Sequence, residues 1–398
     1  MLIHWIWFAQ LPGISQRQKA SLLQRGSEPE ELFYASKRTL EQLPWLDPSC
    51  VAPLTNKDLT QAEQIENTCR RKHIRIITQK EDDFPSRLRN ISDAPVLLYC
   101  MGRIPDFSSQ PVIAVVGTRK STPYGMTTAR KMAKQICQGG GMVISGGARG
   151  IDTSAMEGAL EAGGKTVAVL GCGVDRSYPT CNRNLFVTVA ENGCLLSEYP
   201  PGTPPSPWNF PQRNRILSGI ANGVLVVEAP RSSGALITAR DALEQGRDVF
   251  SVPANIDYVS CEGSNALLQE GAQPVMSGWD VLREYAPMYP GVVMDRSSQG
   301  MESTAPAPAV AEEPADKKSV DNPATLSYSG VEQHNAPLSE EEQKLLSCLD
   351  RHPVAVDELI CRVDMPAGTV LRLLTGLSLK GLVQNHPGRR VSASPQNQ

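Results

Sequence analysis

The 398-residue sequence has few histidines and no closely spaced cysteine pair, and each of these scarcities excludes a class of functional site. The five histidines are His4, His73, His334, His352 and His386, so none lies in the central part of the chain, residues 112–284. A histidine base or a histidine-ligated metal is therefore excluded from that part. The ten cysteines form no C-x-x-C pair, which argues against zinc and against a disulfide framework. We predict no metal site, and we expect a cytoplasmic protein.

Long hydrophobic runs and a strong net charge are also missing. The most apolar stretch, Met1 to Leu11, lacks a basic flank and is too short to span a bilayer, so we interpret it as a buried first helix. We expect no membrane association. The formal net charge of −3 does not indicate a nucleic-acid binder. Any site of that kind must therefore be a local cluster of arginines and backbone N–H groups.

Two nucleotide-binding motifs are missing as well. No lysine follows the glycine turns as it does in a P-loop, which excludes the mechanism of those NTPases. A dinucleotide fingerprint would place G-x-G-x-x-G after the first strand of the sheet. Here the first predicted strand ends in Gly-Thr-Arg, and the paired glycines follow the second strand. A dehydrogenase is disfavoured, and we predict no cofactor.

Residues 112–284 alternate short apolar runs with helical patterns. Near-continuous apolar segments such as 224–227 indicate strands buried on both faces, so we predict an α/β fold with a doubly wound parallel sheet. Ligands of such sheets bind at the carboxyl ends of the strands. The predicted strands are 112–116, 142–145, 166–170, 194–197, 223–228 and 248–252. The predicted helices are 123–138, 151–162, 181–192, 212–220 and 234–245.

The flanking regions differ in composition from this centre. Residues 1–80 predict a helical domain of SAM or helix-hairpin-helix type, in which Ser15 stands where the usual turn has its second glycine. That substitution favours a structural module over one that contacts DNA. Residues 81–111 form a connector that contains a short strand at 94–99 entering the main sheet.

The C-terminal third divides into two parts. Residues 285–337 are rich in Pro, Ala, Ser and Glu, and we predict a flexible linker there. Residues 338–398 resume structure, with a capping box at 339–342, helices near 339–349, 356–363 and 367–380, and a hairpin. Three helices and a hairpin predict a winged helix. Its third helix is mostly Leu and Val, so protein contact or packing is at least as plausible a role as base reading.

The most informative stretch is Ser145-Gly146-Gly147-Ala148-Arg149-Gly150, which follows an apolar run and opens a helical pattern. Glycines tolerate positive φ, so successive N–H groups can point into one concavity, and a helix N-terminus adds partial positive charge. Arg149 adds a planar fork that suits phosphate. The alternative is a tight connection whose glycines only allow close packing.

Polar residues also follow the other predicted strands. Arg119 lies in the turn after the first strand, which favours a ligand over a surface ion pair. Arg213 and Arg215 stand at a helix start, where positive charge opposes the helix dipole, so we expect an anion or carboxylate partner. Glu198 and Glu228 are the expected partners. Phe210 fits base stacking and the core equally well. The candidate DNA-binding residues are Gly117, Thr118, Arg119, Ser145, Gly146, Gly147, Ala148, Arg149, Gly150, Phe210, Arg213, Asn214, Arg215, Ser233 and Gly234, supported by Glu198, Glu228 and Thr238.

Five motifs together resemble the DNA-processing protein A family, also called DprA or Smf. They are Gly117-Thr118-Arg119 with Tyr124-Gly125, the stretch from Ser145 to Asp152, Ser197-Glu198-Tyr199-Pro200, Phe210-Pro211-Gln212-Arg213-Asn214-Arg215, and Ser233-Gly234-Ala235-Leu236-Ile237-Thr238-Ala239. The resemblance implies an extended Rossmann domain that forms a homodimer, a helical N-terminal module and a winged helix. It also implies a non-enzymatic protein that binds single-stranded DNA entering the cell in natural transformation, protects it and loads the RecA recombinase.

By the same resemblance, the family's arginine in the first strand turn falls on Arg119 and its stacking aromatic on Phe210. Some members have a lysine three residues before that aromatic, where this sequence has Pro207. We expect phosphates at the turns 117–119 and 145–150, and bases on Phe210.

Two other functions remain open from sequence. A nucleotide-processing phosphoribohydrolase would need P-G-G-x-G-T-x-x-E after a strand, but the segment 230–238 lacks the double glycine and the glutamate. A nucleotide-sensing scaffold is the third possibility.

Overall fold

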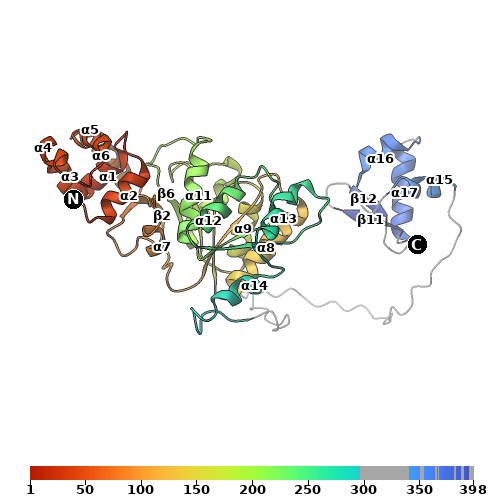
Figure 1. Cartoon of the computed structure of the whole chain (residues 1–398). Coiled ribbons are helices and arrows are strands. Elements are labelled where there is room, and N and C mark those ends of the chain that lie inside the picture. The colour runs from red at the N-terminus through yellow and green to blue at the C-terminus, as the bar shows by residue number, and fades with distance from the viewer. Residues whose placement is uncertain are drawn as a thin grey trace, which may run out of the picture. The chain divides into compact units, whose positions relative to one another are not determined.

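The structure is a computed structural model that describes residues 1–295, 340–349, 354–363, 365, 367–380, 382–386 and 390–393. The chain divides into two compact units, Met1–Ala305 and Pro306–Gln398. Figure 1 shows the elements of each unit along the chain. In the part of the chain that is described, no helix is long and apolar enough to cross a membrane.

The N-terminal region is helical, as predicted. Its helices are α1 (Leu2–Gln10), α2 (Gln16–Gln24), α3 (Pro29–Tyr34), α4 (Lys37–Glu41), α5 (Pro48–Leu54) and α6 (Thr60–Arg71). Ile6 and Phe8 are fully buried and Trp7 is almost so, which confirms that the apolar first segment is a core helix. α1 packs against α3 and α6, so its aromatic side chains form the centre of this helical cluster.

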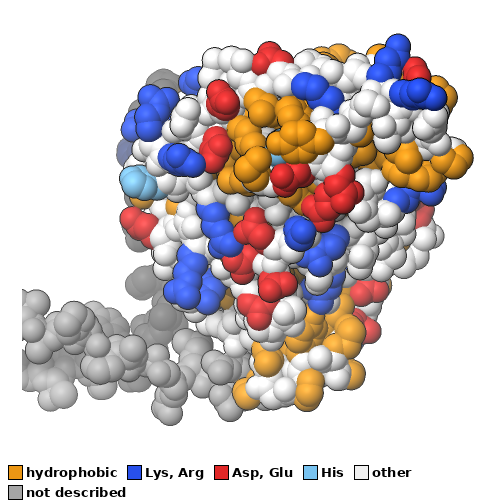
Figure 2. All heavy atoms as spheres, turned by 90° about the vertical axis from the view of Figure 1, so that its left-hand side faces the viewer, with side chains coloured by type: hydrophobic (Ala, Val, Ile, Leu, Met, Phe, Trp, Pro, Cys, Tyr) orange, Lys and Arg blue, Asp and Glu red, His pale blue; other side chains and the backbone are white. Residues whose placement is uncertain are grey.

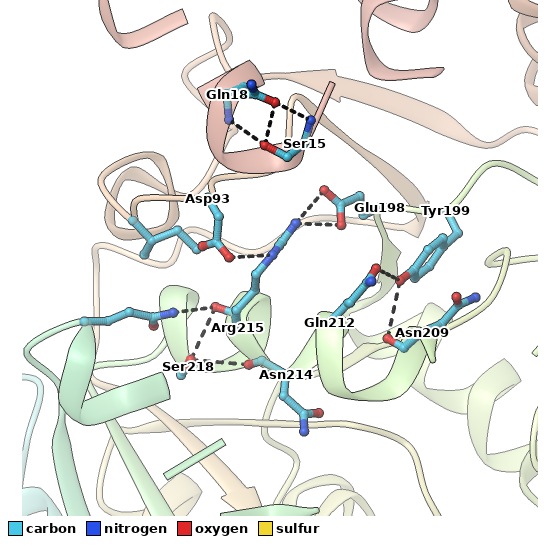
Figure 3. Close-up of polar contacts among 12 residues, drawn as sticks. Ser15, Gln18, Asp93, Glu198, Tyr199, Asn209, Gln212, Asn214, Arg215 and Ser218 are labelled. Carbon is cyan, nitrogen blue, oxygen red and sulfur yellow. Dashed lines mark hydrogen bonds and ion pairs between the residues drawn. The ribbon is translucent and has the colours of Figure 1, made fainter. Parts of the chain in front are cut away.

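The turn between α1 and α2 satisfies its own polar groups. Ser15 caps α2 by accepting the N–H of Gln18 at 3.2 Å, while the N–H of Ser15 donates to Oε1 of Gln18 at 2.9 Å (Figure 3). The N–H group that would face a phosphate is therefore already used within the turn. Figure 2 shows the face that includes these helices, where Lys and Arg are interspersed with Asp and Glu. These observations favour a structural role for the module.

A nine-stranded sheet follows, in the order β1-β2-β6-β5-β4-β3-β7-β8-β9. The strands from β3 to β9 are parallel, whereas β1 and β2 form an antiparallel edge next to β6. The strands are β1 (Arg75–Thr78), β2 (Leu97–Gly102), β3 (Val112–Val116), β4 (Met142–Ser145), β5 (Thr166–Val169), β6 (Cys194–Ser197), β7 (Gly223–Val226), β8 (Asp248–Ser251) and β9 (Gln273–Pro274). The predicted doubly wound α/β sheet is confirmed, with two antiparallel strands added at one edge.

Helices cover both faces of this sheet because its central strands are apolar on both sides. Val112, Ala114 and Val116 of β3 face the cluster that contains α11 and α12 side chains, while Ile113 and Val115 face the cluster under α8 and α9. The helices of this region are α7 (Ser86–Arg89), α8 (Pro123–Gln138), α9 (Ile151–Glu161), α10 (Arg183–Asn192), α11 (Asn209–Ile220), α12 (Ala235–Glu244), α13 (Glu262–Gln269) and α14 (Gly278–Leu282). Short 3-10 turns η1 (Thr180–Asn182), η2 (Val259–Cys261) and η3 (Arg283–Tyr285) complete it.

The winding direction of the sheet reverses at β3. Ala114 pairs with Ile144 of β4 on one side and with Val224 of β7 on the other. The connections from β3 proceed first through β4, β5 and β6, and the chain then returns to β7 and β8. Loops leave β3 and β7 in opposite directions at such a point, which opens a crevice at their carboxyl ends.

Two predictions about the flanks need correction. The segment 1–80, predicted as helical, ends in β1, an edge strand that was not predicted. The strand predicted at 94–99 of the connector is confirmed as β2, at Leu97–Gly102. The linker predicted from 285 begins too early, because Tyr285 is 2 % exposed and its hydroxyl donates to Asp248 at 2.7 Å. Tyr289 accepts hydrogen bonds from Arg87 and Asn222. Residues 296–337 of the predicted linker lie outside the described residues.

The C-terminal unit confirms the predicted winged helix. It contains α15 (Glu340–Ser347), β10 (Val354–Ala355), α16 (Val356–Arg362), α17 (Ala367–Leu379), β11 (Val383–His386) and β12 (Arg390–Ala393), with strand order β10-β12-β11. Leu345, Leu359, Val370 and Leu377 are fully buried in its core. Lys380, after α17, donates to Glu342 at 2.7 Å. Ser339 of the predicted capping box lies outside the described residues.

Candidate nucleic-acid interface

A cleft of about 590 Å³ lies at the carboxyl ends of β3 and β7, where the winding of the sheet reverses. It lies between the turn after β3 and the beginnings of α11 and α12. The predicted site residues that line it are Gly117, Thr118, Arg119, Ala148, Phe210, Arg213, Asn214, Ser233, Gly234 and Thr238. Residues from four separate segments of the sequence are thus brought to one cleft, as the strand-end argument predicts.

The exposed part of the cleft is an aromatic surface with a guanidinium on it. Cζ of the exposed Arg119 lies 4.8 Å from the ring centroid of Phe210. The ring of Tyr178 lies 5.5 Å from that of Phe210, tilted by 36°. Gly171 packs so closely under Phe210 that a Cβ there would lie 2.9 Å from the ring. Nucleobases stack on such surfaces whatever their sequence.

Tyr178 was not among the predicted site residues. It is 40 % exposed, lines the cleft and lies in the loop after β5. The only sequence signal for it is an aromatic residue a few positions beyond a strand end. Such a residue is equally compatible with packing, so the sequence alone did not single it out.

Arg213 does not face solvent, which corrects its predicted role as a DNA contact. It is 4 % exposed, and its Nη1 donates to the carbonyl of Gly146 at 2.6 Å and to that of Val169. These bonds join the turn after β4 to the end of β5. Arg213 therefore supports the floor of the cleft from within.

The glycine turn after β4 has the predicted backbone conformation. Gly147 and Gly150 adopt φ values of +71° and +80°, which favour glycine. Asp152 accepts the N–H of Ala148 at 3.2 Å, and burial raises the pKa of its carboxyl. The N–H of Ala148 is thus already bonded to the protein's own Asp152, which argues against the expected phosphate at this donor.

The prediction that Ser145, Gly146 and Gly147 contact DNA also needs correction. Ser145 is fully buried and donates to the carbonyl of Val115 at 2.7 Å, and Gly146 and Gly147 are buried as well. None of the three presents a surface to a DNA strand. Arg149 is exposed and Ala148 and Gly150 are partly so, and these three stay candidates for contact.

Arg215 is the centre of a buried ion-pair network (Figure 3). Its Nη2 donates to both carboxylate oxygens of Glu198 at 2.8 Å, and its Nε lies 3.2 Å from Asp93. Burial opposes the charged guanidinium, but Glu198 and Asp93 outweigh it and raise the pKa of Arg215. The predicted pairing with Glu198 is confirmed, whereas the prediction that Arg215 contacts DNA is wrong, because its guanidinium is enclosed by carboxylates.

Glu228 was the other carboxylate expected to pair with an arginine, and that expectation is wrong. Its Oε2 accepts both the N–H and the hydroxyl of Thr122 at 3.0 Å, at the beginning of α8. A carboxylate at a helix N-terminus compensates the unpaired N–H groups there. Gly125 leaves room for it, since a Cβ at that position would lie 1.7 Å from Oε2 of Glu228.

Among the remaining predicted residues, Asn214 and Gly234 connect α11 to the beginning of α12. Asn214 donates through Nδ2 to the carbonyl of Gly234 at 3.2 Å, and Ser233 accepts the N–H of Ala235 at 3.3 Å. Thr118 and Thr238 are buried, with one side of each on the cleft. Asn214 therefore fixes the two helix beginnings relative to each other.

Comparison with known proteins identifies the family. Residues 75–286 match the model of the DNA recombination-mediator protein A family, and residues 332–389 match the DprA winged helix domain. The chain belongs to the DNA recombination-mediator protein A family. The resemblance inferred from the five motifs is confirmed.

Some relatives of this DNA recombination-mediator protein A family member have names that refer to DNA processing, and others are named Smf. Protein Smf of Synechocystis sp. is 34% identical over 331 residues, which is 80% of each chain. DNA processing protein DprA of Streptococcus pneumoniae is 43% identical over 205 residues, covering 52% of this chain and 72% of that protein. The X-ray structure of DNA processing protein A from Streptococcus pneumoniae superposes with a TM-score of 0.62 at 34% identity, over 71% of this chain and 98% of that one.

One carboxylate beside the network makes a testable contribution to the stability of this family member. Burial, then Glu244 and Asp93, raise the pKa of Asp241 to about 6. A raised pKa stabilises the folded state below the unfolded pKa of about 4, and this stabilisation is lost as pH rises through about 6. After discounting for partial exposure, we expect Asp241→Asn to raise the free energy of unfolding by about 1 kcal/mol at pH 7.

Urea unfolding across pH 3.5 to 8 measures this effect. The gain from Asp241→Asn should disappear below about pH 4, where aspartate is protonated in both states. Asp257→Asn, at an exposed aspartate, is the control and should change little. A gain that is equal at all pH values would contradict the assignment.

Proposed function

We propose that this protein binds single-stranded DNA in the cleft at the ends of β3 and β7. The observation that carries the proposal is the guanidinium of Arg119 above the ring of Phe210, with Tyr178 beside it. Aromatic and arginine surfaces of this kind accept unpaired bases, whose faces are hidden inside a duplex. The DNA-processing names of the relatives support the same ligand.

In this proposal, exposed donors bind the phosphates. Arg119 and Lys120 are exposed at the turn after β3, and Ser233 and Gly234 lie at the beginning of α12. The N–H groups of Ser233, Ala235 and Leu236 are already bonded within this turn. In this proposal Arg119 and Lys120 therefore provide most of the phosphate binding. We propose that the protein acts by holding the strand and carries out no chemistry on it.

We further propose the biological role that the family resemblance implied. The protein would protect single strands that enter the cell during natural transformation and load RecA onto them, as a cytoplasmic homodimer. A strand bound through base faces and phosphates stays free of base pairing, which is the state that a recombinase needs. Sequence-tolerant binding suits DNA of any origin.

Arg119→Ala tests the binding site. We expect it to weaken binding to an oligo-dT by about tenfold and to reduce the salt dependence of the affinity, because one phosphate-binding charge and one stacking group are lost. Fluorescence anisotropy over 50 to 300 mM salt measures both quantities. Arg70→Ala, at an exposed arginine of α6, is the matched control.

Two results would overturn the proposed function. The first is a preference of the wild-type protein for duplex over single-stranded DNA of equal length. The second is an unchanged affinity of Arg119→Ala with its thermal unfolding also unchanged. Release of a free base from a nucleoside monophosphate by the purified protein would instead support the hydrolase alternative.

A further inference from the structure

Trp208 is the most exposed large aromatic side chain in the described residues, with 81 % of its surface accessible. Tryptophan is on average well buried, since its indole has a large apolar area. This one lies directly before α11, two residues from Phe210. Neither the motif match nor the family comparison assigns it a role.

The backbone around Trp208 is held rigidly. Pro205 and Pro207 fix φ on its N-terminal side, and the N–H of Asn209 donates to the carbonyl of Ser206 at 3.0 Å. The Asn209 side chain donates in turn to the carbonyl of Gly171 at 3.0 Å. The indole is therefore presented on a fixed backbone, so that little conformational entropy is lost when a ligand stacks on it.

Trp208 and Phe210 do not stack on each other. Residues two apart at a helix beginning point to different sides, and Phe210 packs on Gly171 and Arg119. Pro207 and Pro211 line the cleft beside them. A strand whose base stacks on Phe210 would pass these prolines to reach Trp208 with a neighbouring base.

We propose that Trp208 is a second base-stacking surface, which extends the cleft along the same DNA single strand. The proposal rests on the proposed function, because its ligand is the strand held by Arg119 and Phe210. An indole face stacks on any of the four bases, so the contact adds affinity without sequence preference. It carries no charge, so it adds affinity without salt dependence.

The experiment compares Trp208→Ala, Trp208→Phe and Trp45→Ala in the full-length protein. Trp45 is also a partly exposed tryptophan, at 38 %, but it lies in the N-terminal helical region. The probe is a fluorescently labelled oligo-dT, with anisotropy read across a salt series. Intrinsic tryptophan fluorescence is recorded with unlabelled oligo-dT, because stacking on a base quenches an indole.

We expect Trp208→Ala to weaken binding about tenfold at an unchanged salt slope, and to lose most of the DNA-induced quenching. Trp208→Phe should retain most of the affinity, and Trp45→Ala should match the wild type. Wild-type affinity and quenching in Trp208→Ala would overturn the inference while the proposed function stands. Failure of the wild type to prefer single strands would overturn both.

Discussion

Replacing Arg215 with methionine is expected to lower the free energy of unfolding by about 3–5 kcal/mol. Arg215 is 7 % exposed, and its guanidinium has three contacts to the carboxylates of Glu198 and Asp93. Methionine fills much of the same volume but leaves Glu198, which is 11 % exposed, without its cation. A buried charge without a partner costs far more than the original pair contributed.

The network also connects distant parts of the chain, so its loss should destabilise several elements of the fold. Asp93 precedes β2, Glu198 follows β6 and Arg215 lies in α11. Lys19 of α2 is buried near Glu198, and burial lowers the pKa of its amine to about 8. Loss of Arg215 would therefore loosen α11, which carries Phe210, as well as the junction with the N-terminal helices.

Urea or thermal unfolding measures this loss. Arg119→Met makes the same chemical change at an exposed arginine and should shift the free energy of unfolding by no more than about 0.5 kcal/mol. Adding Glu198→Gln to Arg215→Met should recover part of the stability, because the unpaired buried charge is removed. A single Arg215→Met variant that unfolds like the wild type would show that the network contributes nothing.

Phe210→Ala is expected to reduce the affinity for single-stranded DNA by about 100-fold, which corresponds to about 2.7 kcal/mol. In the proposed binding mode the ring is the surface for a base, and it is also the support on which the guanidinium of Arg119 lies. Without the ring, Arg119 loses its orientation over the cleft. The loss should therefore exceed that of Arg119→Ala.

A double-mutant cycle separates the two contributions. If Arg119 acts largely through its position on the ring, the double variant should lose less affinity than the sum of the single variants. Phe210→Tyr keeps an aromatic face and is the matched control, with most of the affinity retained. Strict additivity, or an unaffected Phe210→Ala, would disprove the coupled stacking surface. Circular dichroism and thermal unfolding show whether each variant is folded.

The elements of the sheet were predictable because local signals agreed with the tertiary environment. The segments 112–116, 142–145 and 194–197 are strands at those bounds, and 123–138 is a helix at those bounds. Apolar runs between glycines need burial on both faces, and only a covered parallel sheet provides it. The four-residue strand β1 follows directly after a helix and has no periodic signal, which is why it was missed.

The partners of the charged residues were less predictable. The helix was predicted to begin at 212, but α11 begins at Asn209, so Arg213 and Arg215 lie within the helix and not at its start. Both arginines have oxygen partners as expected, but the pattern did not distinguish a protein oxygen from a phosphate. Asp93 lies more than a hundred residues before Arg215, and nothing in the local sequence places it there. Asp152 lies only four residues after Ala148, but the sequence did not show that its carboxyl would accept that N–H in place of a phosphate.

That carboxylate has a consequence for how a strand enters the cleft. A terminal phosphate carries more negative charge than an internal one, and a glycine turn that bound phosphate would select for it. Asp152 already accepts the N–H of Ala148 at 3.2 Å, so this turn has one donor fewer for such a phosphate. Under the proposed binding mode, we therefore expect the cleft to show no preference for a 5′ or 3′ end, and a long polymer to bind equally well anywhere along its length.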